Sequence, residues 1–220
     1  MATAVNRAIA RIPHLDTFLA EHPRALAGWG RKPSGQRAVA LSRLLRRSYV
    51  LLEDGFLRSV ARDAPSLSLL VDDIGCYYDA TAPSRMELAI ASGATSSQSA
   101  HAREVMAAWR AAGLSKYNHA PDYQGDLPAR FVLLADQVWL PKGALEHPRV
   151  RVIADGCHPV RLIREAEVVY TVTSLIGFEA LVHGRPVHCF GMPFYAGWGL
   201  TQDRLPPPHR RGEARNEDLV

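Results

Sequence analysis

The sequence has few cysteines, and none are spaced as metal ligands or as a redox pair. The three residues, Cys76, Cys157 and Cys189, are odd in number and contain no C-x-x-C pair. Such usage is typical of a reduced, cytoplasmic protein without a disulfide framework. The neighbours Cys157-His158 and His188-Cys189 match no usual zinc spacing, so we expect no metal site.

The sequence also lacks any apolar run long enough to span a bilayer. Its first seven residues contain no apolar core of signal-peptide length, so we expect any membrane association to be peripheral. The formal net charge is +4, but the basic residues are scattered and are not interleaved with aromatic residues. This pattern argues against a nucleic-acid partner and favours an anionic small substrate or an anionic membrane surface.

Short apolar runs alternate with helix-like patterns along the chain. The predicted strands include 49–52, 67–71, 131–135, 168–172 and 187–190, with 150–153 as a candidate strand, and the predicted helices include 37–47, 85–91 and 100–112. The alternation predicts an α/β fold with parallel sheets. In the first of these helices, we expect a buried face formed by Ala38, Leu41, Leu44 and Leu45.

The length of 220 residues allows two small domains. We expect two Rossmann-like domains with a cleft between them. The N-terminal domain would cover 1–125 and a C-terminal, nucleotide-binding domain would cover 126–205. The polar residues 206–220 would form a loose tail.

Two hydroxyl residues stand where a buried strand gives way to a helix. Thr173 and Ser174 follow the apolar run 168–172, and Gly184 stands where the following helix should end. Helix-start amides at the carboxyl edge of a parallel sheet bind anions, most often phosphates. The simpler alternative is that Thr173 or Ser174 only caps the helix.

A second polar cluster follows the strand 49–52. Glu53, Asp54, Arg58 and Ser59 bring two carboxylates, a guanidinium and a hydroxyl to the carboxyl end of that strand. The alternatives to a binding or catalytic role are a solvated turn for the carboxylates and a surface ion pair for Arg58.

Six blocks occur in a specific order: GWGRKPS at 28–34, EDGFLRS at 53–59, GCYYDA at 75–80, LSKYN at 114–118, VTSLIGFEAL at 172–181 and CFGMPFYAGWGLT at 189–201. Together they resemble the bacterial capsule polysaccharide biosynthesis family, and the chain is similar to one module of its β-Kdo transferases. The resemblance implies a GT-B-like glycosyltransferase that moves Kdo from CMP-Kdo onto a lipid-linked acceptor of the phosphatidylglycerol type. It implies no cofactor besides the donor substrate. It further implies a cytoplasmic place, peripheral on the inner membrane, with other capsule assembly and export proteins as partners.

The resemblance assigns the donor to the late hydroxyl pair. Thr173 and Ser174 match the family's nucleotide-binding segment, which would hold the phosphate of CMP-Kdo. Glu179, on the same helix, would reach the ribose hydroxyls.

The early acidic cluster would act on the acceptor side, in the N-terminal domain. Glu53 and Asp54 are similar to the acidic motif of bacterial sialyltransferases, in which a carboxylate deprotonates the acceptor hydroxyl. Asp54 or Glu53 would therefore be the general base. Arg58, beside Ser59, would bind the sugar carboxylate or the phosphate through its forked donors.

The segment 136–149 departs from the family. Family members place an aspartate a few residues after this point, but 138–143 contains no carboxylate. The family's Lys-x-His-Pro motif is also missing, since His147-Pro148 stands in a different context. A parallel crossover usually takes about a dozen residues or more and a helix, and this segment is interrupted by proline and glycine. We therefore expect a lost strand or an irregular region in a shortened second domain.

Three functions stay open. The first is a single-module Kdo transferase. The second is a catalytically inactive, internally deleted relative that persists as a binding or scaffold protein. The third is a different nucleotide-sugar enzyme of GT-B shape, because one fold hosts many functions.

Overall fold

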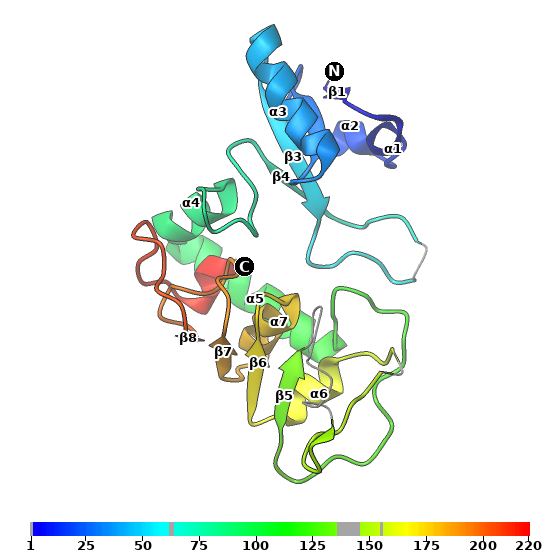
Figure 1. Ribbon diagram of the computed structural model, residues 1–220, viewed down its shortest axis with the longest axis vertical. Helices are drawn as coiled ribbons and strands as arrows, with labels where there is room; N and C mark the ends of the chain where they lie inside the picture. Colours follow the sequence, from blue (N-terminus) through cyan, green and yellow to red (C-terminus); the bar gives the residue numbers. More distant parts are fainter. Residues whose placement is uncertain (1, 62–63, 136–145, 155) are drawn as a thin grey trace. The chain divides into compact units, whose positions relative to one another are not determined.

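Two compact units make up the chain, of which the computed structural model describes residues 2–61, 64–135, 146–154 and 156–220 (Figure 1). The first unit is Met1–Ala89 and the second is Ile90–Val220. Each unit contains a four-stranded sheet in which most neighbouring strands run parallel. The chain is therefore a mixed α/β protein with parallel sheets, as predicted.

The first unit is built on the sheet order β1-β2-β3-β4. Its strands are β1 (Thr3–Ala4), β2 (Leu26–Trp29), β3 (Tyr49–Asp54) and β4 (Leu69–Asp72), and its helices are α1 (Arg7–Ala10), α2 (Leu15–Phe18) and α3 (Pro33–Leu45). Helix α3 connects the parallel neighbours β2 and β3, because parallel strands need a crossover connection. Side chains from α1, β2 and β3 form the apolar core, with Ile9, Ala27, Val50 and Leu52 fully or almost fully buried.

Strand β3 is longer than predicted, and its neighbour β4 runs antiparallel to it. Glu53 pairs with Leu70 and Asp54 with Leu69, so both carboxylates lie in the ladder and not in a turn. The prediction of a parallel strand here was wrong. Among the described residues between β3 and β4 there is no helix, and a parallel return usually needs one.

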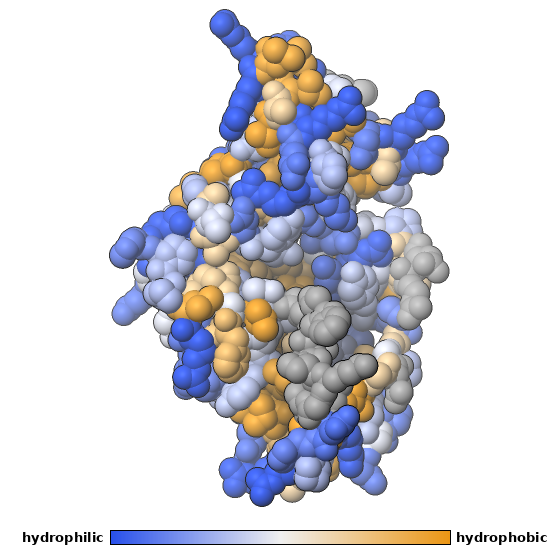
Figure 2. All heavy atoms as spheres, viewed as in Figure 1, coloured by the Kyte–Doolittle hydropathy of each residue, from blue (hydrophilic) through white to orange (hydrophobic). Residues whose placement is uncertain are grey.

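Helix α3 begins earlier than predicted, with Pro33 in its first turn, and it buries small residues. Gly35, Ala38 and Ser42 face the sheet, whereas Leu44 and Leu45 are 77% and 52% exposed. The predicted buried face was therefore wrong for both leucines. The helix lies so close to the sheet that large side chains do not fit between them. Figure 2 shows an apolar area over α3 that is surrounded by hydrophilic side chains.

The second unit contains the fully parallel sheet β5-β6-β7-β8. Its strands are β5 (Val132–Ala135), β6 (Val168–Thr171), β7 (Val187–Cys189) and β8 (Gln202–Asp203), and its helices are α5 (Ser96–Ala112), α6 (Val160–Glu165), α7 (Leu175–Val182) and the 3-10 helix η2 (Asn216–Leu219). Helix α4 (Arg85–Ser92) runs across the division between the units. A capping box between Thr95 and Gln98 starts α5, and Gly113 ends it at a positive φ of 61°.

The units divide at Ala89, whereas we expected the first domain to end at residue 125. The difference arises because α5 packs against α7 and η2, which places 90–125 in the second unit.

The tail 206–220, which we expected to be loose, is packed. Arg211 is buried and donates to the carbonyl oxygens of Pro193 and Ala196, both at 2.7 Å. Asp218 accepts from the amide of Ala94 at 2.7 Å, and Leu219 is buried. Specific partners for charged side chains therefore order this polar segment.

The candidate strand 150–153 does not form, as expected for an irregular region, and β5 pairs directly with β6. Val132 and Leu134 of β5 are about half exposed. The expectation of an irregular region thus holds for the described residues 146–154. The residues 136–145, where the family's aspartate is missing, lie outside the described residues.

Candidate functional site

The late hydroxyl pair lies where β6 ends and α7 begins. Ser174 is the N-cap of α7, and its Oγ accepts from the amide of Ile176 at 3.3 Å. The amide of Ser174 in turn donates to the Oγ1 of Thr171 at 3.0 Å, and its carbonyl accepts from the Tyr195 hydroxyl. Thr173 is exposed beside it. The capping interpretation is therefore confirmed for Ser174, and the exposed helix start remains suited to an anion.

Glu179 points into the protein. It is 1% exposed, and both carboxylate oxygens lie 2.9 Å from the donating Ser115 hydroxyl. Its Oε1 also accepts from the amide of Lys116 at 2.9 Å. Burial raises the pKa of Glu179 from 4.5 to about 7, and the bonds from Lys116 and Ser115 oppose that rise. The carboxylate thus holds the segment 114–118, and its contact with a ribose stays a prediction.

Asn118 and His158 make a second set of polar contacts at the segment 114–118. Asn118 accepts from the amide of Ser115 at 2.9 Å and donates to its carbonyl at 2.7 Å. His158, which is 7% exposed, faces the Oδ1 atoms of Asn118 and Asp122, each at 3.2 Å. The sequence indicated no role for Asn118, Asp122 or His158. The LSKYN block was the available signal, but a motif does not reveal which distant side chains contact it.

The early acidic cluster divides between the two faces of β3. Asp54 accepts from the Ser66 hydroxyl at 2.9 Å and lies 3.4 Å from the Arg58 Nε. Arg58 also donates to the Ala64 carbonyl at 3.2 Å and to the Ser59 hydroxyl at 3.3 Å. The structure therefore brings Asp54, Arg58 and the fully buried Ser59 together. The ion pair between Asp54 and Arg58 is only partly buried.

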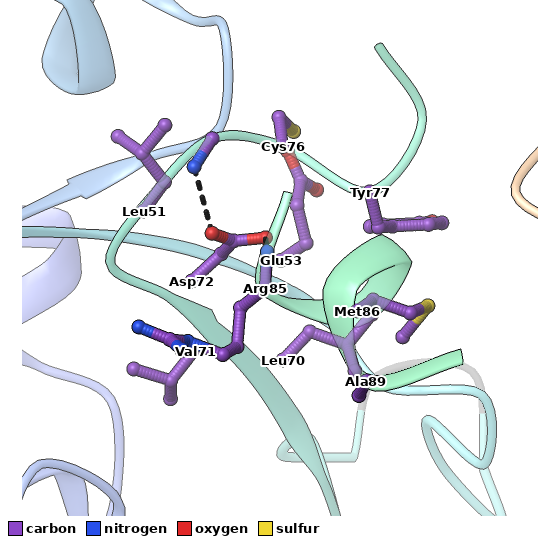
Figure 3. A pocket seen from close by; sticks show the side chains of 11 residues that line it. Leu51, Glu53, Leu70, Val71, Asp72, Cys76, Tyr77, Arg85, Met86 and Ala89 are labelled. Carbon is purple, nitrogen blue, oxygen red and sulfur yellow. Dashed lines mark hydrogen bonds between the residues drawn. The ribbon is translucent and has the colours of Figure 1, made fainter. Parts of the chain in front are cut away.

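Glu53 instead lines a mostly apolar cavity of about 210 Å³ (Figure 3). The cavity lies between β3, β4, the turn at 75–77 and α4, and its other polar lining residues include Asp72 and Arg85. Asp72 is almost fully buried and accepts from the amides of Gly75 at 2.7 Å and Arg85 at 2.9 Å. Because successive residues of a strand face opposite sides, only one of the two adjacent carboxylates lines this cavity.

Three of the six sequence blocks meet at Glu53. A Cβ at Gly30 would lie 1.8 Å from the Glu53 Oε1 and 2.7 Å from the Tyr78 hydroxyl, and the positive φ of 34° at this position favours glycine. The Tyr78 hydroxyl accepts from the amide of Arg31 at 3.0 Å. Burial, followed by smaller effects that include the charge of Glu53, raises the pKa of Tyr78 above its usual range. The phenol is therefore neutral and can act as a hydrogen-bond donor.

Within the described residues, no group of three or more histidine, cysteine, aspartate or glutamate residues could hold a metal ion. In the same residues, no helix combines the length and the apolar character needed to cross a membrane.

The fold places the chain among mixed α/β proteins that carry polar residues at the carboxyl ends of their strands. Residues 24–125 and 140–220 match the family described as capsule polysaccharide biosynthesis protein. The chain belongs to this family. The unmatched interval, 126–139, includes part of the segment whose sequence departs from the family.

Two curated relatives are much longer than this chain. The capsule polysaccharide modification protein LipA of Neisseria meningitidis serogroup A is 34% identical over 266 aligned positions, which cover 91% of this chain and 38% of LipA. The lipopolysaccharide-processing protein LpsZ of Rhizobium meliloti is 32% identical over 90% of this chain and 57% of its own length. The alignment with LipA is longer than the chain itself, so LipA carries residues that this chain lacks.

Two solved structures of Thermosulfurimonas dismutans KpsC are similar to the chain. The β-Kdo 2,4 transferase is 34% identical with a TM-score of 0.86, over 100% of this chain and 88% of that structure. The β-Kdo 2,7 transferase is 26% identical with a TM-score of 0.63, over 94% and 79%.

Proposed function

We propose that this chain is a GT-B-like glycosyltransferase of capsule polysaccharide biosynthesis, which moves Kdo from CMP-Kdo onto a lipid-linked acceptor. The observation that carries the proposal is the match of the whole chain to the KpsC β-Kdo 2,4 transferase. The higher TM-score and identity to this structure than to the 2,7 transferase favour a 2,4 linkage.

The strand order supports a shortened Rossmann-like second domain. A doubly wound sheet of order 3-2-1-4-5-6 pairs its first strand with its fourth. The observed order β5-β6-β7-β8 corresponds to strands 1-4-5-6 of that scheme. The missing family segment would supply strand 2, and residues 150–153 would then be strand 3, left without the neighbour against which it pairs.

The donor would bind the second unit. The exposed amides at the start of α7, with Thr173 and Ser174, suit the phosphate of CMP-Kdo, and Glu179 would act on the ribose directly or through the segment it holds. This phosphate stays with CMP as the leaving group, so donors aimed at it stabilise the charge that develops on it when the bond to the sugar breaks.

The acceptor would bind the first unit. Asp54 or Glu53 would take the proton from the acceptor hydroxyl as the new glycosidic bond forms. Arg58 would bind the carboxylate of Kdo, and the buried Ser59, whose hydroxyl accepts from Arg58, would hold the guanidinium in place. Glu53, which lines the apolar cavity, is the alternative base.

A lipid-linked acceptor would place the reaction at the inner face of the inner membrane. A phosphatidylglycerol-type lipid is anionic and confined to the bilayer, so the protein would act as a peripheral membrane protein together with capsule assembly and export proteins. The exposed Leu44 and Leu45, flanked by Arg43 and Arg46 at the end of α3, are suited to such a surface.

The test is incubation of the purified chain with CMP-Kdo and a Kdo-primed glycolipid, followed by mass spectrometry. The expected product is one Kdo heavier than the acceptor. A protein that binds CMP in calorimetry but forms no product is instead the inactive, internally deleted relative. A protein that neither binds CMP nor forms product contradicts both functions.

A further inference from the structure

The segment 115–118 is held between two buried polar side chains of the second unit. From α7, Glu179 binds the Ser115 hydroxyl and the Lys116 amide. From a position two residues before α6, His158 contacts Asn118, which closes the segment onto Ser115. We call these contacts of Glu179 and His158 with the segment 115–118 the clamp. The clamp connects two regions of the chain more than 60 residues apart, as the separation of Ser115 and Glu179 shows.

Burying a carboxylate costs free energy that an apolar side chain in the same place would not cost. Phe178, Ala180, Leu181 and Val182 around Glu179 in α7 are buried apolar residues, so packing alone does not call for a carboxylate at this position. The carboxylate is matched to its partners, since its two oxygens accept one side-chain donor and one backbone donor. Its contribution is therefore the placement of the segment that supplies those donors.

The residue placed by this contact is Lys116. Its backbone amide is fixed by Glu179, while its ammonium lies over the Tyr117 ring, 5.7 Å from the ring centre. In the described part of the chain, the Lys116 ammonium pairs with no carboxylate in a salt bridge. The side chain is half-buried. A cation that is held at its backbone and whose ammonium forms no salt bridge with a described carboxylate is suited to an anionic ligand.

We infer that Glu179 is a positioning residue that holds 115–118 so that Lys116 contacts the anionic part of the nucleotide-sugar donor. His158 completes the clamp through Asn118. The inference rests on the proposed function for the identity of the donor, whereas the clamp itself does not depend on it. Glu179 then acts on the donor through Lys116 and does not touch the ribose.

The first experiment tests the clamp without any ligand. Hydrogen exchange of the full chain is followed by mass spectrometry in peptides covering 114–118, for wild type, Glu179→Leu and Ser115→Ala. We expect exchange of the Lys116 amide to accelerate at least roughly tenfold in Glu179→Leu, because its acceptor is lost. Ser115→Ala keeps the core intact and should give a smaller increase. Unchanged exchange in both variants overturns the clamp.

The second experiment tests the donor contact. CMP affinity is measured by calorimetry, and KM for CMP-Kdo and kcat by product formation, for Lys116→Met, Glu179→Leu and the double variant. Loss of one charged contact should weaken CMP binding about tenfold in Lys116→Met and raise KM more than kcat falls. The double variant should be no weaker than Lys116→Met alone, because Glu179 acts through Lys116.

Glu179→Gln and Glu167→Gln serve as the matched comparisons. The amide of Glu179→Gln keeps an acceptor for the Lys116 amide, so it should restore most of the affinity lost in Glu179→Leu. Glu167 is a partly exposed partner of Arg130, and its variant should bind CMP like wild type. If the losses of CMP affinity caused by Glu179→Leu and Lys116→Met multiply in the double variant, Glu179 contacts the donor directly. If wild type binds no CMP, the donor role of Lys116 and the proposed function are both overturned. Hydrogen exchange still tests separately whether Glu179 holds the segment 115–118.

Discussion

Adjacent carboxylates on β3 face different surroundings, and this difference separates their expected roles. Asp54 is paired with Arg58 and Ser66 at the partly exposed end of the strand, whereas Glu53 lines an apolar cavity. If Asp54 is the general base, its loss removes proton transfer, and Glu53 acts on acceptor binding.

For Asp54→Asn we expect the rate of Kdo transfer to fall roughly 100-fold or more, the typical contribution of a general base. The free energy of unfolding should change by less than about 1 kcal/mol, because the ion pair with Arg58 is partly exposed. Glu53→Gln should raise KM for the acceptor with a smaller fall in kcat. Product formation and urea unfolding measure these effects, with Asp16→Asn in α2 as an exposed control. A larger fall in kcat for Glu53→Gln than for Asp54→Asn would instead identify Glu53 as the base.

Glu179 makes the stability of the protein depend on pH. Its pKa is raised from 4.5 to about 7, chiefly by burial, so the folded state binds the proton more tightly than the unfolded state. Its contribution to the free energy of unfolding is complete below pH 4.5 and is lost as the pH rises through about 7. A pKa difference of this size corresponds to about 3 kcal/mol.

Urea unfolding of wild type and Glu179→Gln between pH 4 and 8 measures this contribution. Wild type should lose stability relative to the variant as the pH rises across that window. His183, the C-cap of α7, works in the opposite direction, because burial and nearby arginines lower its pKa from 6.5 to about 4. The His183 effect is present in both proteins and cancels in the difference. Parallel pH profiles would show that Glu179 does not titrate in this range.

Sequence patterns located the polar residues but not their directions. The position of Ser174 at a helix start followed from the strand and helix patterns around it. The inward direction of Glu179 did not follow, because helical periodicity cannot tell which distant loop covers a given face. The contact between Ser115 and Glu179 joins residues that only the tertiary fold brings together.

At the scale of elements, glycine sets how closely α3 approaches its sheet. A side chain at Gly35 would lie 1.8 Å from the carbonyl oxygen of Gly30, a backbone atom that cannot move without moving the loop after β2. For Gly35→Ala we expect the free energy of unfolding to fall by about 2 kcal/mol, as overpacking typically costs. Thermal or urea unfolding measures this, with Gly212→Ala as control because it has open space around it. Equal stability of Gly35→Ala and wild type would contradict this close packing.

Most helices and strands were predictable, while pairing directions and some buried faces were not. The apolar run 168–172 became β6, and the prediction of a helix ending before Gly184 was confirmed by α7. The antiparallel β4 was missed because a strand's direction depends on its connection. Leu44 and Leu45 were placed in the core because periodicity alone cannot detect that glycine and alanine form the contact face of α3.

At the scale of the whole molecule, the chain carries a net charge of +4 and an exposed apolar site at the end of α3 (Figure 2). Leu44 and Leu45 are exposed, and Arg43 and Arg46 flank them. Apolar side chains beside cations favour the surface of an anionic bilayer, where each buried leucine and each cation contributes about 1 kcal/mol or more. This is the surface on which a lipid-linked acceptor would be found.

Sedimentation with phosphatidylglycerol-containing vesicles tests this membrane surface. The double variant Leu44→Asp/Leu45→Asp should bind such vesicles at least roughly tenfold more weakly than wild type, since both apolar contacts are lost and negative charge is added. Its stability should be nearly unchanged because both side chains are already exposed. Leu205→Asp, at a leucine of similar exposure in the second unit, should bind like wild type. Wild-type binding should also weaken with added salt and on neutral vesicles, because charge provides part of the attraction. Equal vesicle binding by wild type and the double variant would place the membrane contact elsewhere on the protein.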